Sequence, residues 1–371
     1  MKQILYRQGQ YSDLKKFTET YSSENIFLVR GKSSYLNSGA KKFIENDLNL
    51  NDPVSFFNFE NNPRIEDLKI GISLFKEGDY KLIIAIGGGS VLDMAKLISV
   101  MAHQDERIED IVQKNTPLNR KKTPLISVPA TAGTGAEATS FAVLYIDKVK
   151  YSFADELVLP DYVYLTSEFS LSANPYLTAC TGLDAFCQAV ESIWSINSNE
   201  VSEKFAFEAV RIIWENLFSS VINDDKNAKI KMQEAAFLAG KAINITKTTA
   251  SHAVSYAFST YYDIPHGHAV ALSLPFFFEF NSKVTDANCN DKRGSDAVKE
   301  RLKKIMEILE MNSGNVKEGL TTFFKTLNIN IDILSLIPDF NSEIIFKNIN
   351  LERLKNNPAK VTENTISNFL P

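Results

Sequence analysis

The chain has 371 residues, a length that exceeds one comfortable hydrophobic core and favours two domains. Its formal net charge of −5 argues against nucleic-acid binding, and no apolar run is long enough for a transmembrane helix or a signal peptide. Three cysteines without a CxxC pair form no disulfide framework, so we expect a reduced, cytoplasmic protein. The charge and the apolar runs lead us to expect that it binds neither nucleic acid nor a membrane.

The first half of the chain alternates short apolar runs with segments of helical spacing. Strands are predicted over Asn25–Arg30, Pro53–Phe59, Lys81–Ile86 and Leu125–Val128. Helices are predicted between them, over Tyr35–Ile44, Ile65–Phe75 and Val91–Met101. Repeated strand–helix units of this kind predict an open, doubly wound parallel sheet.

The pattern of predicted elements changes near residues 171–174, from alternating strands and helices to helices alone. Helices are then predicted over Pro175–Ser195, Val201–Phe218, Asn227–Asn244, Thr248–Tyr261 and Ala297–Met311, and no comparable apolar strand follows. We therefore predict an α/β domain over residues 1–173 and an all-α domain over residues 174–371.

Two loops rich in glycine follow predicted buried strands. Gly87–Ser90 lacks the side chains that would keep a phosphate away from the backbone, and the next helix presents free N–H groups there. Pro129–Thr139 is crowded with small residues, and its Thr131 and Thr134 could donate to phosphate or ribose oxygens. One such loop could be an ordinary tight turn, but two at the carboxyl ends of parallel strands predict a nucleotide site.

Four polar residues in the second half suit a metal. Asp184 and Gln188 lie one turn apart on a predicted helix and share a face. His252 lies in another predicted helix, and His266 follows a proline that should end it and so begins the next element. Mixed oxygen and imidazole ligands suit Fe²⁺ or Zn²⁺. The alternative is a solvated aspartate and ordinary core histidines.

Together these segments resemble the iron-containing (group III) alcohol dehydrogenase family, which shares its architecture with dehydroquinate synthase. The matching stretches are Gly87–Lys96 (GGGSVLDMAK), Pro129–Glu137 (PATAGTGAE), Thr181–Glu191 (TGLDAFCQAVE), the spacing of His252 and His266, and Pro265–Gly267 (PHG). The resemblance implies a dinucleotide-binding N-terminal domain and a helical domain that binds metal and substrate.

Individual roles follow from the same resemblance. Asp184, His252 and His266 match three of the four metal ligands of the family. The residues that would contact NAD or NADP are Gly87, Gly88, Gly89, Ser90, Thr131, Thr134 and Lys150. In the implied activity, Fe²⁺ or Zn²⁺ polarises an aldehyde oxygen as a Lewis acid and the nicotinamide delivers a hydride.

The chain departs from the family in three places. Gln188 stands where the fourth ligand is usually histidine, and an amide oxygen is the weaker partner. Tyr256 stands where many members have another histidine near the nicotinamide. The turn after the first predicted strand contains Arg30, Gly31, Lys32, Ser33 and Ser34. It lacks the acidic residue that binds a ribose 2′-hydroxyl, which favours NADP, or the use of both NAD and NADP.

The segment around His252 resembles phosphonoacetaldehyde reductases, which make 2-hydroxyethylphosphonate. On one continuous helix, Asn244 and Thr248 would lie on the same side as His252, with Lys247 on an adjacent face. These side chains, and His268, could bind a phosphonate. The alternative substrate is a generic short-chain alcohol, aldehyde or diol.

Several questions stay open at the level of sequence. Tyr256 and His268 are the candidate catalytic proton donors, beside bound water and the cofactor ribose. A dehydroquinate-synthase-like lyase and a non-catalytic nucleotide-binding protein are the alternatives to a dehydrogenase. A homodimer is a candidate assembly, with the small-molecule substrate as the other partner.

Overall fold

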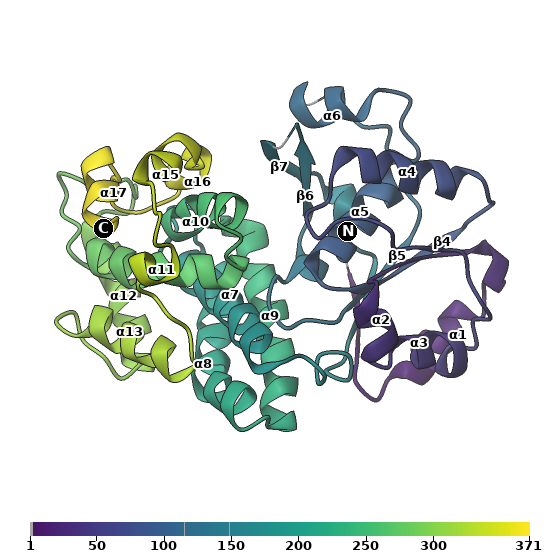
Figure 1. Cartoon of the computed structure of the whole chain (residues 1–371), viewed down its shortest axis with the longest axis horizontal. Helices are drawn as coiled ribbons and strands as arrows, with labels where there is room; N and C mark the ends of the chain where they lie inside the picture. The colour runs from purple at the N-terminus through teal and green to yellow at the C-terminus, as the bar shows by residue number, and fades with distance from the viewer. Residues whose placement is uncertain (1–2, 115, 148) are drawn as a thin grey trace. The chain divides into compact units, whose positions relative to one another are not determined.

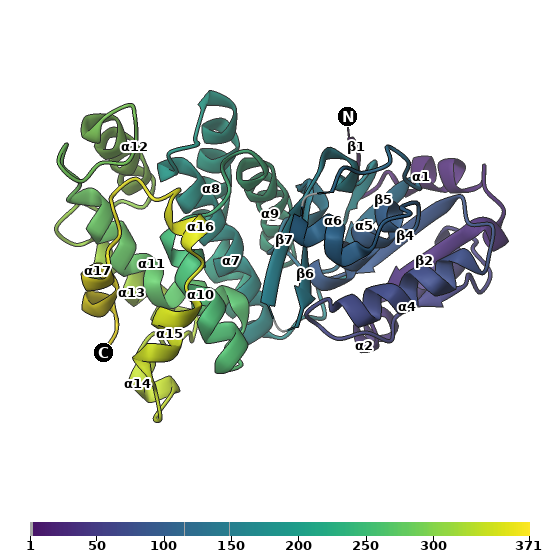
Figure 2. The same cartoon turned by 90° about the horizontal axis from the view of Figure 1, so that it is seen from above.

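The computed structural model describes all residues except 1, 2, 115 and 148. It divides into two compact units, one formed by Met1–Thr131 and Gly135–Ser172, the other by Ala132–Thr134 and Ala173–Pro371. The short segment Ala132–Thr134 therefore belongs to the second unit although its neighbours belong to the first. Figures 1 and 2 show the elements of both units.

A parallel sheet forms the centre of the first unit. Its strands in the described residues are β1 (Ile4–Arg7), β2 (Ile26–Arg30), β3 (Ser55–Phe56), β4 (Leu82–Gly87), β5 (Leu125–Pro129) and β8 (Tyr162–Leu165), in the order β1-β8-β5-β4-β2-β3. Every neighbouring pair is parallel. β4 and β5 are buried along their whole length, as strands covered on both faces are.

Helices cover both faces of this sheet, as Figure 1 shows. They are α1 (Tyr11–Thr18), α2 (Ser33–Asn37), α3 (Ala40–Lys42), α4 (Ile65–Lys76), α5 (Gly89–Met101) and α6 (Ile108–Lys114). Because alternate strand residues face opposite sides, Phe27 and Ile83 pack with α4 and α5. Leu28 and Ile84 pack with α1 and α3 on the other face. The predicted doubly wound α/β architecture is confirmed.

Some predicted elements of the first unit differ in the structure. The single helix expected over Tyr35–Ile44 is wrong, because Gly39 has a φ of 87° and interrupts it between α2 and α3. Of Pro53–Phe59, only Ser55–Phe56 forms a strand. The sequence analysis missed β1, β8 and the antiparallel hairpin of β6 (Phe141–Ile146) and β7 (Val149–Ala154), which is visible in Figure 2.

The regular elements of the second unit are helices, joined by links that include one isolated β-bridge between Cys289 and Ala359. Its helices are α7 (Pro175–Trp194), α8 (Glu200–Ile222), α9 (Lys226–Thr246), α10 (Ala250–Tyr261), α11 (His266–Ser282), α12 (Ser295–Ile308), α13 (Val316–Thr326), α14 (Ile333–Leu336), α15 (Ser342–Asn348), α16 (Leu351–Leu354) and α17 (Glu363–Phe369). No helix in the described part of the chain is both long and apolar enough to cross a membrane.

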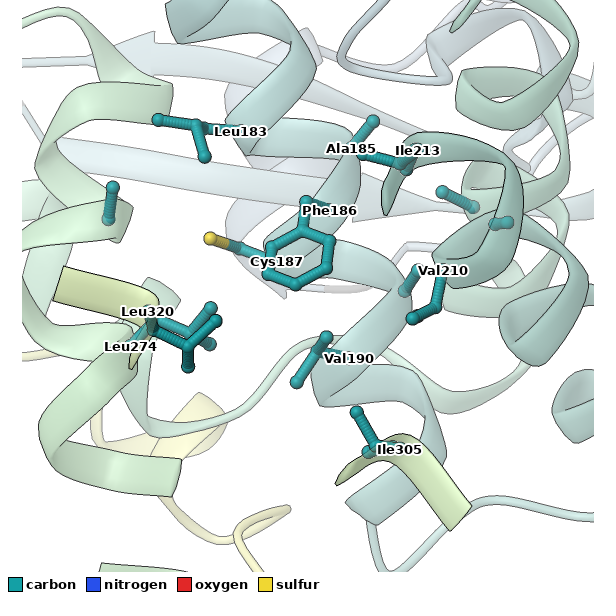
Figure 3. Packing of buried hydrophobic residues seen from close by; sticks show 14 of the residues in the cluster. Leu183, Ala185, Phe186, Cys187, Val190, Val210, Ile213, Leu274, Ile305 and Leu320 are labelled. Atoms are coloured by element: carbon teal, nitrogen blue, oxygen red, sulfur yellow. The ribbon is translucent and has the colours of Figure 1, made fainter. Parts of the chain in front are cut away.

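Helix α7 is the central element of this unit and packs against α8, α9, α11 and α12. Its start is set by the side chain of Asn174, which accepts a hydrogen bond from the backbone N–H of Leu177, and by Pro175 in the first turn. Figure 3 shows Phe186, Cys187 and Val190 in the core, with contributions from neighbouring helices. The central position of α7 makes it a rigid base for the polar residues that it carries.

Helices α10 and α11 differ most from expectation. The helix predicted over Thr248–Tyr261 begins at Ala250, and α9 continues to Thr246. Helix α11 was not predicted, although its first residue, His266, does begin a new element after Pro265 as expected. Pro275 lies inside α11, and a proline within a run usually signals a break.

Candidate functional site

Helix α7 places three polar side chains along one face. Asp184, Gln188 and Glu191 are spaced by one and two helical turns, and their exposed fractions are 3%, 4% and 0%. Buried carboxylates and amides need partners, since leaving them unpaired in the interior is costly. Their partners come from α10, α11 and the segment Ala132–Thr134.

Helices α10 and α11 bring two imidazoles to Asp184. His252 lies in the first turn of α10, and its Nε2 is 3.4 Å from Asp184 Oδ1. The Nε2 of His266, at the start of α11, is 3.9 Å from the same oxygen. One ligand atom from each of the three residues lies within 4.8 Å of the others. The structure thus gathers Asp184, His252 and His266 into one divalent-metal site.

Gln188 lies beside this group with its two amide atoms in different roles. Its Nε2 donates to Asp184 Oδ1 at 3.0 Å and to the Thr134 carbonyl at 3.4 Å. Its Oε1 is buried and has no hydrogen-bond partner among the described residues. A buried oxygen without a partner is unusual and calls for an explanation. A bound cation would satisfy it, so the four side chains fit a divalent metal.

Two glycines allow the backbones at the site to approach closely. A Cβ atom on Gly267 would lie 1.8 Å from the carbonyl oxygen of Cys180, so only glycine lets the start of α11 pack on α7. A Cβ on Gly133 would lie 2.8 Å from the carbonyl oxygen of Thr181. These contacts explain why glycine follows His266 and precedes Thr134.

The charges of Asp184, His252 and His266 are coupled to one another. Burial raises the pKa of Asp184, but the charges of His266 and His252 and hydrogen bonds from His252 and Gln188 outweigh it and lower that pKa. Burial lowers the pKa of His252, but the charge of Glu191 and hydrogen bonds with Asp184 and Glu191 raise it to about 10. Asp184 is therefore an anion, and without a metal the positive charge beside it is a proton on His252, which a metal bound through Nε2 would displace.

Glu191 was not assigned a role in the sequence analysis, yet it contacts the site. Its Oε2 is hydrogen-bonded to His252 Nδ1, and its Oε1 accepts from Thr249 Oγ1 at 2.6 Å and from the Ser251 backbone N–H at 2.9 Å. The sequence offered one indication of this role. Glu191 lies two turns after Asp184 on the same face of α7, and these two are the only acidic residues in that helix.

The two candidate proton donors lie in different surroundings. Tyr256, one turn after His252 on α10, stacks its ring on that of His266 with a centroid separation of 5.8 Å. His268 is buried, with Nδ1 at 2.9 Å from the Tyr176 hydroxyl and Nε2 at 2.5 Å from the Asn330 carbonyl. Burial lowers the pKa of His268, against a raising effect of the bond to Asn330. The structure thus puts Tyr256 beside the candidate metal ligand His266, while both His268 nitrogens have protein partners.

The helical arrangement expected for the substrate residues is wrong. Asn244 lies in α9, whereas Lys247 and Thr248 lie in the link before α10, so they do not share a helix with His252. Lys247 has a φ of 59° and a ψ of 178°, and this backbone conformation ends α9. Thr246 Oγ1 donates a hydrogen bond to the Lys247 carbonyl at 2.8 Å, and Asn356 Nδ2 donates one to the Thr248 carbonyl at 3.0 Å. These two bonds hold the link in place.

The predicted cofactor loops lie at the carboxyl edge of the sheet in the first unit. Gly88 immediately precedes α5, whose first N–H groups point to this edge. A Cβ on Gly88 would lie 3.7 Å from the Thr131 side chain, so the two loops are neighbours. The chain leaves β2 towards β3 and leaves β4 towards β5, on opposite sides. Ligands of open α/β sheets bind where the connections diverge in this way.

The other predicted cofactor residues are distributed more widely. Gly31 and Lys32 follow β2 at the same edge, and α2 begins at Ser33. The Ser90 hydroxyl donates to the Asn61 carbonyl. Lys150 lies on β7 of the hairpin. Thr134 lies in the segment that belongs to the second unit, where its carbonyl contacts Gln188.

Arg30, at the end of β2, is packed rather than freely solvated. Its guanidinium lies 3.8 Å from the centre of the Phe57 ring and 4.5 Å from that of Tyr35. It also donates to Ser55 Oγ and to the Gly31 carbonyl. These contacts hold a permanent cation next to the turn that contains Lys32.

Comparisons with known proteins agree with this architecture. Residues 2–167 match iron-containing alcohol dehydrogenase, and residues 178–370 match the C-terminal part of the Fe-containing alcohol dehydrogenase family. The solved iron-containing alcohol dehydrogenase of Thermotoga maritima is 26% identical, with a TM-score of 0.83 over 99% of this chain and 96% of that one.

Two curated relatives cover smaller parts. The NADPH-dependent butanol dehydrogenase of Clostridium saccharobutylicum is 32% identical over 78% of this chain and 73% of its own length. Long-chain-alcohol dehydrogenase 1 of Geobacillus thermodenitrificans is 34% identical over 58% of this chain, a match that spans about half of that relative, 55% of its length. The chain belongs to the iron-containing alcohol dehydrogenase family.

Proposed function

We propose that this protein is a metal-dependent, NAD(P)H-linked aldehyde reductase in which Asp184, His252, His266 and Gln188 hold Fe²⁺ or Zn²⁺. The observation that carries the proposal is the approach of three ligand atoms within 4.8 Å, two of them on buried side chains and the third on the half-buried His266. The unpartnered Oε1 of Gln188 supports it as the fourth ligand. When bound, the metal supplies Lewis-acid chemistry at an aldehyde oxygen and the nicotinamide supplies a hydride.

The protein's own residues then orient the reactants and move a proton. Asp184 contributes the negative charge that retains a cation, and the two histidines and Gln188 complete a neutral set of donors. Tyr256 stacks on His266, so its hydroxyl is our first candidate for proton transfer to the nascent alkoxide. His268 is the second candidate, acting through Tyr176, with which it shares a hydrogen bond.

For the cofactor, we propose that the pyrophosphate binds at Gly87, Gly88, Gly89 and Ser90, where α5 begins. Thr131, Thr134 and Lys150 would make further contacts with it. Gly31, Lys32 and Ser33 would face the adenosine ribose. The packed Arg30 guanidinium and exposed Lys32 favour a ribose 2′-phosphate, and therefore NADPH, although NADH could also be used.

For the substrate, we propose phosphonoacetaldehyde, reduced to 2-hydroxyethylphosphonate. The support is the backbone of Lys247, whose φ and ψ lie in a region that non-glycine residues rarely occupy. Keeping a lysine there costs about 1–3 kcal/mol, which suggests that its side chain is needed. Asn244 and Thr248 flank it and could add donors to a phosphonate.

The deciding experiment is a reductase assay of phosphonoacetaldehyde against acetaldehyde and other short-chain aldehydes, with NADPH and NADH in parallel. We expect kcat/KM to be highest for phosphonoacetaldehyde with NADPH. Preference for the uncharged aldehydes would favour the alternative, a generic short-chain alcohol or diol dehydrogenase. Absence of any NAD(P)H oxidation with aldehydes would favour a lyase or a non-catalytic nucleotide-binding protein.

The Lys247→Gly variant tests the substrate proposal at residue level. Glycine relieves the backbone strain and removes the cation, so we expect higher thermal stability together with weaker use of phosphonoacetaldehyde. Loss of a charged hydrogen bond should lower kcat/KM by roughly 10- to 100-fold. Acetaldehyde serves as the internal control, because its kcat/KM should change little. Equal effects on both aldehydes would contradict the role of Lys247.

A further inference from the structure

Glu191 is a buried carboxylate whose contacts join a metal ligand to the start of a helix. It lies on α7 and has an exposed fraction of 0%. A carboxylate in such a position requires hydrogen bonds that satisfy both oxygens. The two oxygens of Glu191 face different groups, and this division suggests its role.

The first oxygen, Oε1, serves the beginning of α10. It accepts hydrogen bonds from the Thr249 backbone at 3.2 Å, the Ser251 backbone at 2.9 Å and the Thr249 hydroxyl at 2.6 Å. Thr249 is the N-cap residue of α10, but its own side chain makes no capping bond to this helix. The N–H groups that every helix start leaves unpaired are therefore satisfied from α7. A negative charge at this end also complements the helix dipole.

The second oxygen, Oε2, is hydrogen-bonded to Nδ1 of His252. A carboxylate only accepts, so the proton of this bond belongs to Nδ1. The other ring nitrogen, Nε2, points towards Asp184, whose Oδ1 is 3.4 Å away, and a metal bound there would displace the proton that Nε2 carries beside this carboxylate. Nε2 is thus available as a ligand atom, on the side where His266 and Gln188 also lie.

We propose that Glu191 is a positioning residue, which holds His252 in the tautomer and orientation that binds the metal through Nε2. The contacts at the start of α10 fix the backbone of His252, and the Oε2 contact fixes its ring. A carboxylate behind a metal-bound histidine raises its basicity and commonly strengthens metal binding. This inference rests on the metal site of the proposed function and not on the identity of the substrate.

The Glu191→Gln variant tests the proposal with Zn²⁺ as the probe. Glutamine has nearly the same size but only one acceptor oxygen, so it cannot serve both the helix start and Nδ1–H. We expect the Kd for Zn²⁺, measured by competition with a chelator in the absence of cofactor and substrate, to rise about 10- to 100-fold. A Kd within about twofold of the unchanged protein would overturn the proposal.

A matched control is Asp291→Asn in the same unit. Asp291 is also a buried carboxylate, with an exposed fraction of 5%, but its partners are Arg293 and Arg301 and not a metal ligand. We expect this variant to lose thermal stability and to keep its Kd for Zn²⁺ within about twofold. Equal weakening of Zn²⁺ binding in both variants would show a general loss of stability and would overturn the proposal.

A measurement on the unaltered protein avoids the risk that Glu191→Gln does not fold. The chain has only four histidines, so ¹⁵N-labelled histidine can be followed by NMR in the Zn²⁺-loaded protein. We expect the ring of His252 to carry its proton on Nδ1 and to bind Zn²⁺ through Nε2. A proton on Nε2 would contradict the inference.

The two proposals can fail separately. A protein that binds Zn²⁺ tightly and loses that affinity in Glu191→Gln, but does not reduce aldehydes, would refute the proposed function and retain the positioning role. A protein that reduces aldehydes and whose Glu191→Gln variant binds Zn²⁺ normally would do the reverse.

Discussion

Gln188 stands at the position where the fourth metal ligand of the family is usually a histidine. Its Nε2 is engaged by Asp184 and Thr134, and its Oε1 is the atom left for a cation. An amide oxygen is a weaker donor to Zn²⁺ or Fe²⁺ than an imidazole nitrogen. We therefore expect this site to bind its metal less tightly than a site with four strong ligands.

Replacing Gln188 by histidine should strengthen the site. We expect the affinity for Zn²⁺ to increase by roughly tenfold, about 1.4 kcal/mol, because an imidazole replaces the amide oxygen. Competition against a chromogenic chelator measures this change. An unchanged or lower affinity would show that Gln188 does not ligate the metal and serves to orient Asp184.

Replacing His266 by alanine should separate chemistry from cofactor binding. We expect kcat/KM for aldehyde reduction to fall on the order of 1000-fold or more, since Lewis-acid stabilisation contributes several kcal/mol. The Kd for NADPH, measured by its fluorescence, should stay unchanged. His103→Ala is the histidine control, because His103 lies in the first unit and is bonded to Thr123. Turnover in His266→Ala without metal would refute the mechanism.

Glu137, in the second glycine-containing loop, should make stability depend on pH. Burial raises its pKa to about 7, against smaller lowering effects of a hydrogen bond to its own backbone and of the Lys96 charge. The folded protein therefore keeps this proton between pH 4.5 and about 7 while the unfolded chain releases it, so stability falls as pH rises through that window. The loss is about 3 kcal/mol at most.

The Glu137→Gln variant should flatten this dependence. We expect the free energy of unfolding of the first unit, measured in urea at pH 5 and pH 8, to differ less between the two pH values than in the unchanged protein. Glu24→Gln, at an exposed site, should keep the original difference. A Glu137→Gln protein with the same fall in stability would place the titrating group elsewhere.

At the scale of elements, the metal site depends on how closely α11 approaches α7. The two helices meet at Gly267 and Cys180, where even a methyl group has no space. This contact delivers His266 to the face of α7 that carries Asp184 and Gln188. Because of this packing, the glycine in the first turn of α11 is required for the geometry of the candidate ligands.

Replacing Gly267 by alanine should disturb the helix contact and the metal site together. The added Cβ would meet a backbone carbonyl, which cannot rotate away as a side chain can, so we expect a loss of roughly 3 kcal/mol. Thermal unfolding and the Kd for Zn²⁺ measure the two effects. Gly314→Ala is the control, because that glycine is exposed and its Cβ would meet only the Asn312 side chain, at 3.2 Å. A Gly267→Ala protein with unchanged Zn²⁺ affinity would contradict this account.

Elements with a plain periodic signal were predicted well. Helix α7 runs over Pro175–Trp194, against a predicted Pro175–Ser195, because its apolar face, its proline and its capping asparagine all agree. Helix α11 was missed because Pro275 suggests an end where tertiary packing sustains the helix. The predicted helices Asn227–Asn244 and Thr248–Tyr261 leave Lys247 between them, but a lysine gives no sign of the positive φ that it has there.

At the scale of the whole molecule, the candidate metal site lies within one of the two units. All four candidate ligands lie in the helical unit, and so do both tryptophans, Trp194 and Trp214. Trp194 Nε1 also donates to Thr249 Oγ1, one of the groups bonded to Glu191. Tryptophan fluorescence therefore reports the unfolding of the unit that holds the site.

Zn²⁺ should stabilise the helical unit by mass action. At a free concentration 100 times its Kd, we expect the free energy of unfolding followed by tryptophan fluorescence to rise by about 2.7 kcal/mol. A chelator should reverse this gain without preventing NADPH binding. The same titration on His266→Ala should show a much smaller effect. Equal stabilisation of the variant would indicate that Zn²⁺ binds elsewhere.

The sequence by itself determined the two-part α/β and helical architecture, the glycine loops and the identity of Asp184, His252 and His266 as a group. The architecture and the glycine loops follow from local periodicity and turn chemistry, which a linear chain displays, whereas the grouping of Asp184, His252 and His266 also needed the resemblance to the iron-containing alcohol dehydrogenase family. Only the tertiary structure decided that Glu191 lies behind His252, that Gly267 packs on α7 and that Asn244 and Thr248 do not share a helix with His252. Those relations arise from contacts between separate helices, and no spacing within one segment encodes them.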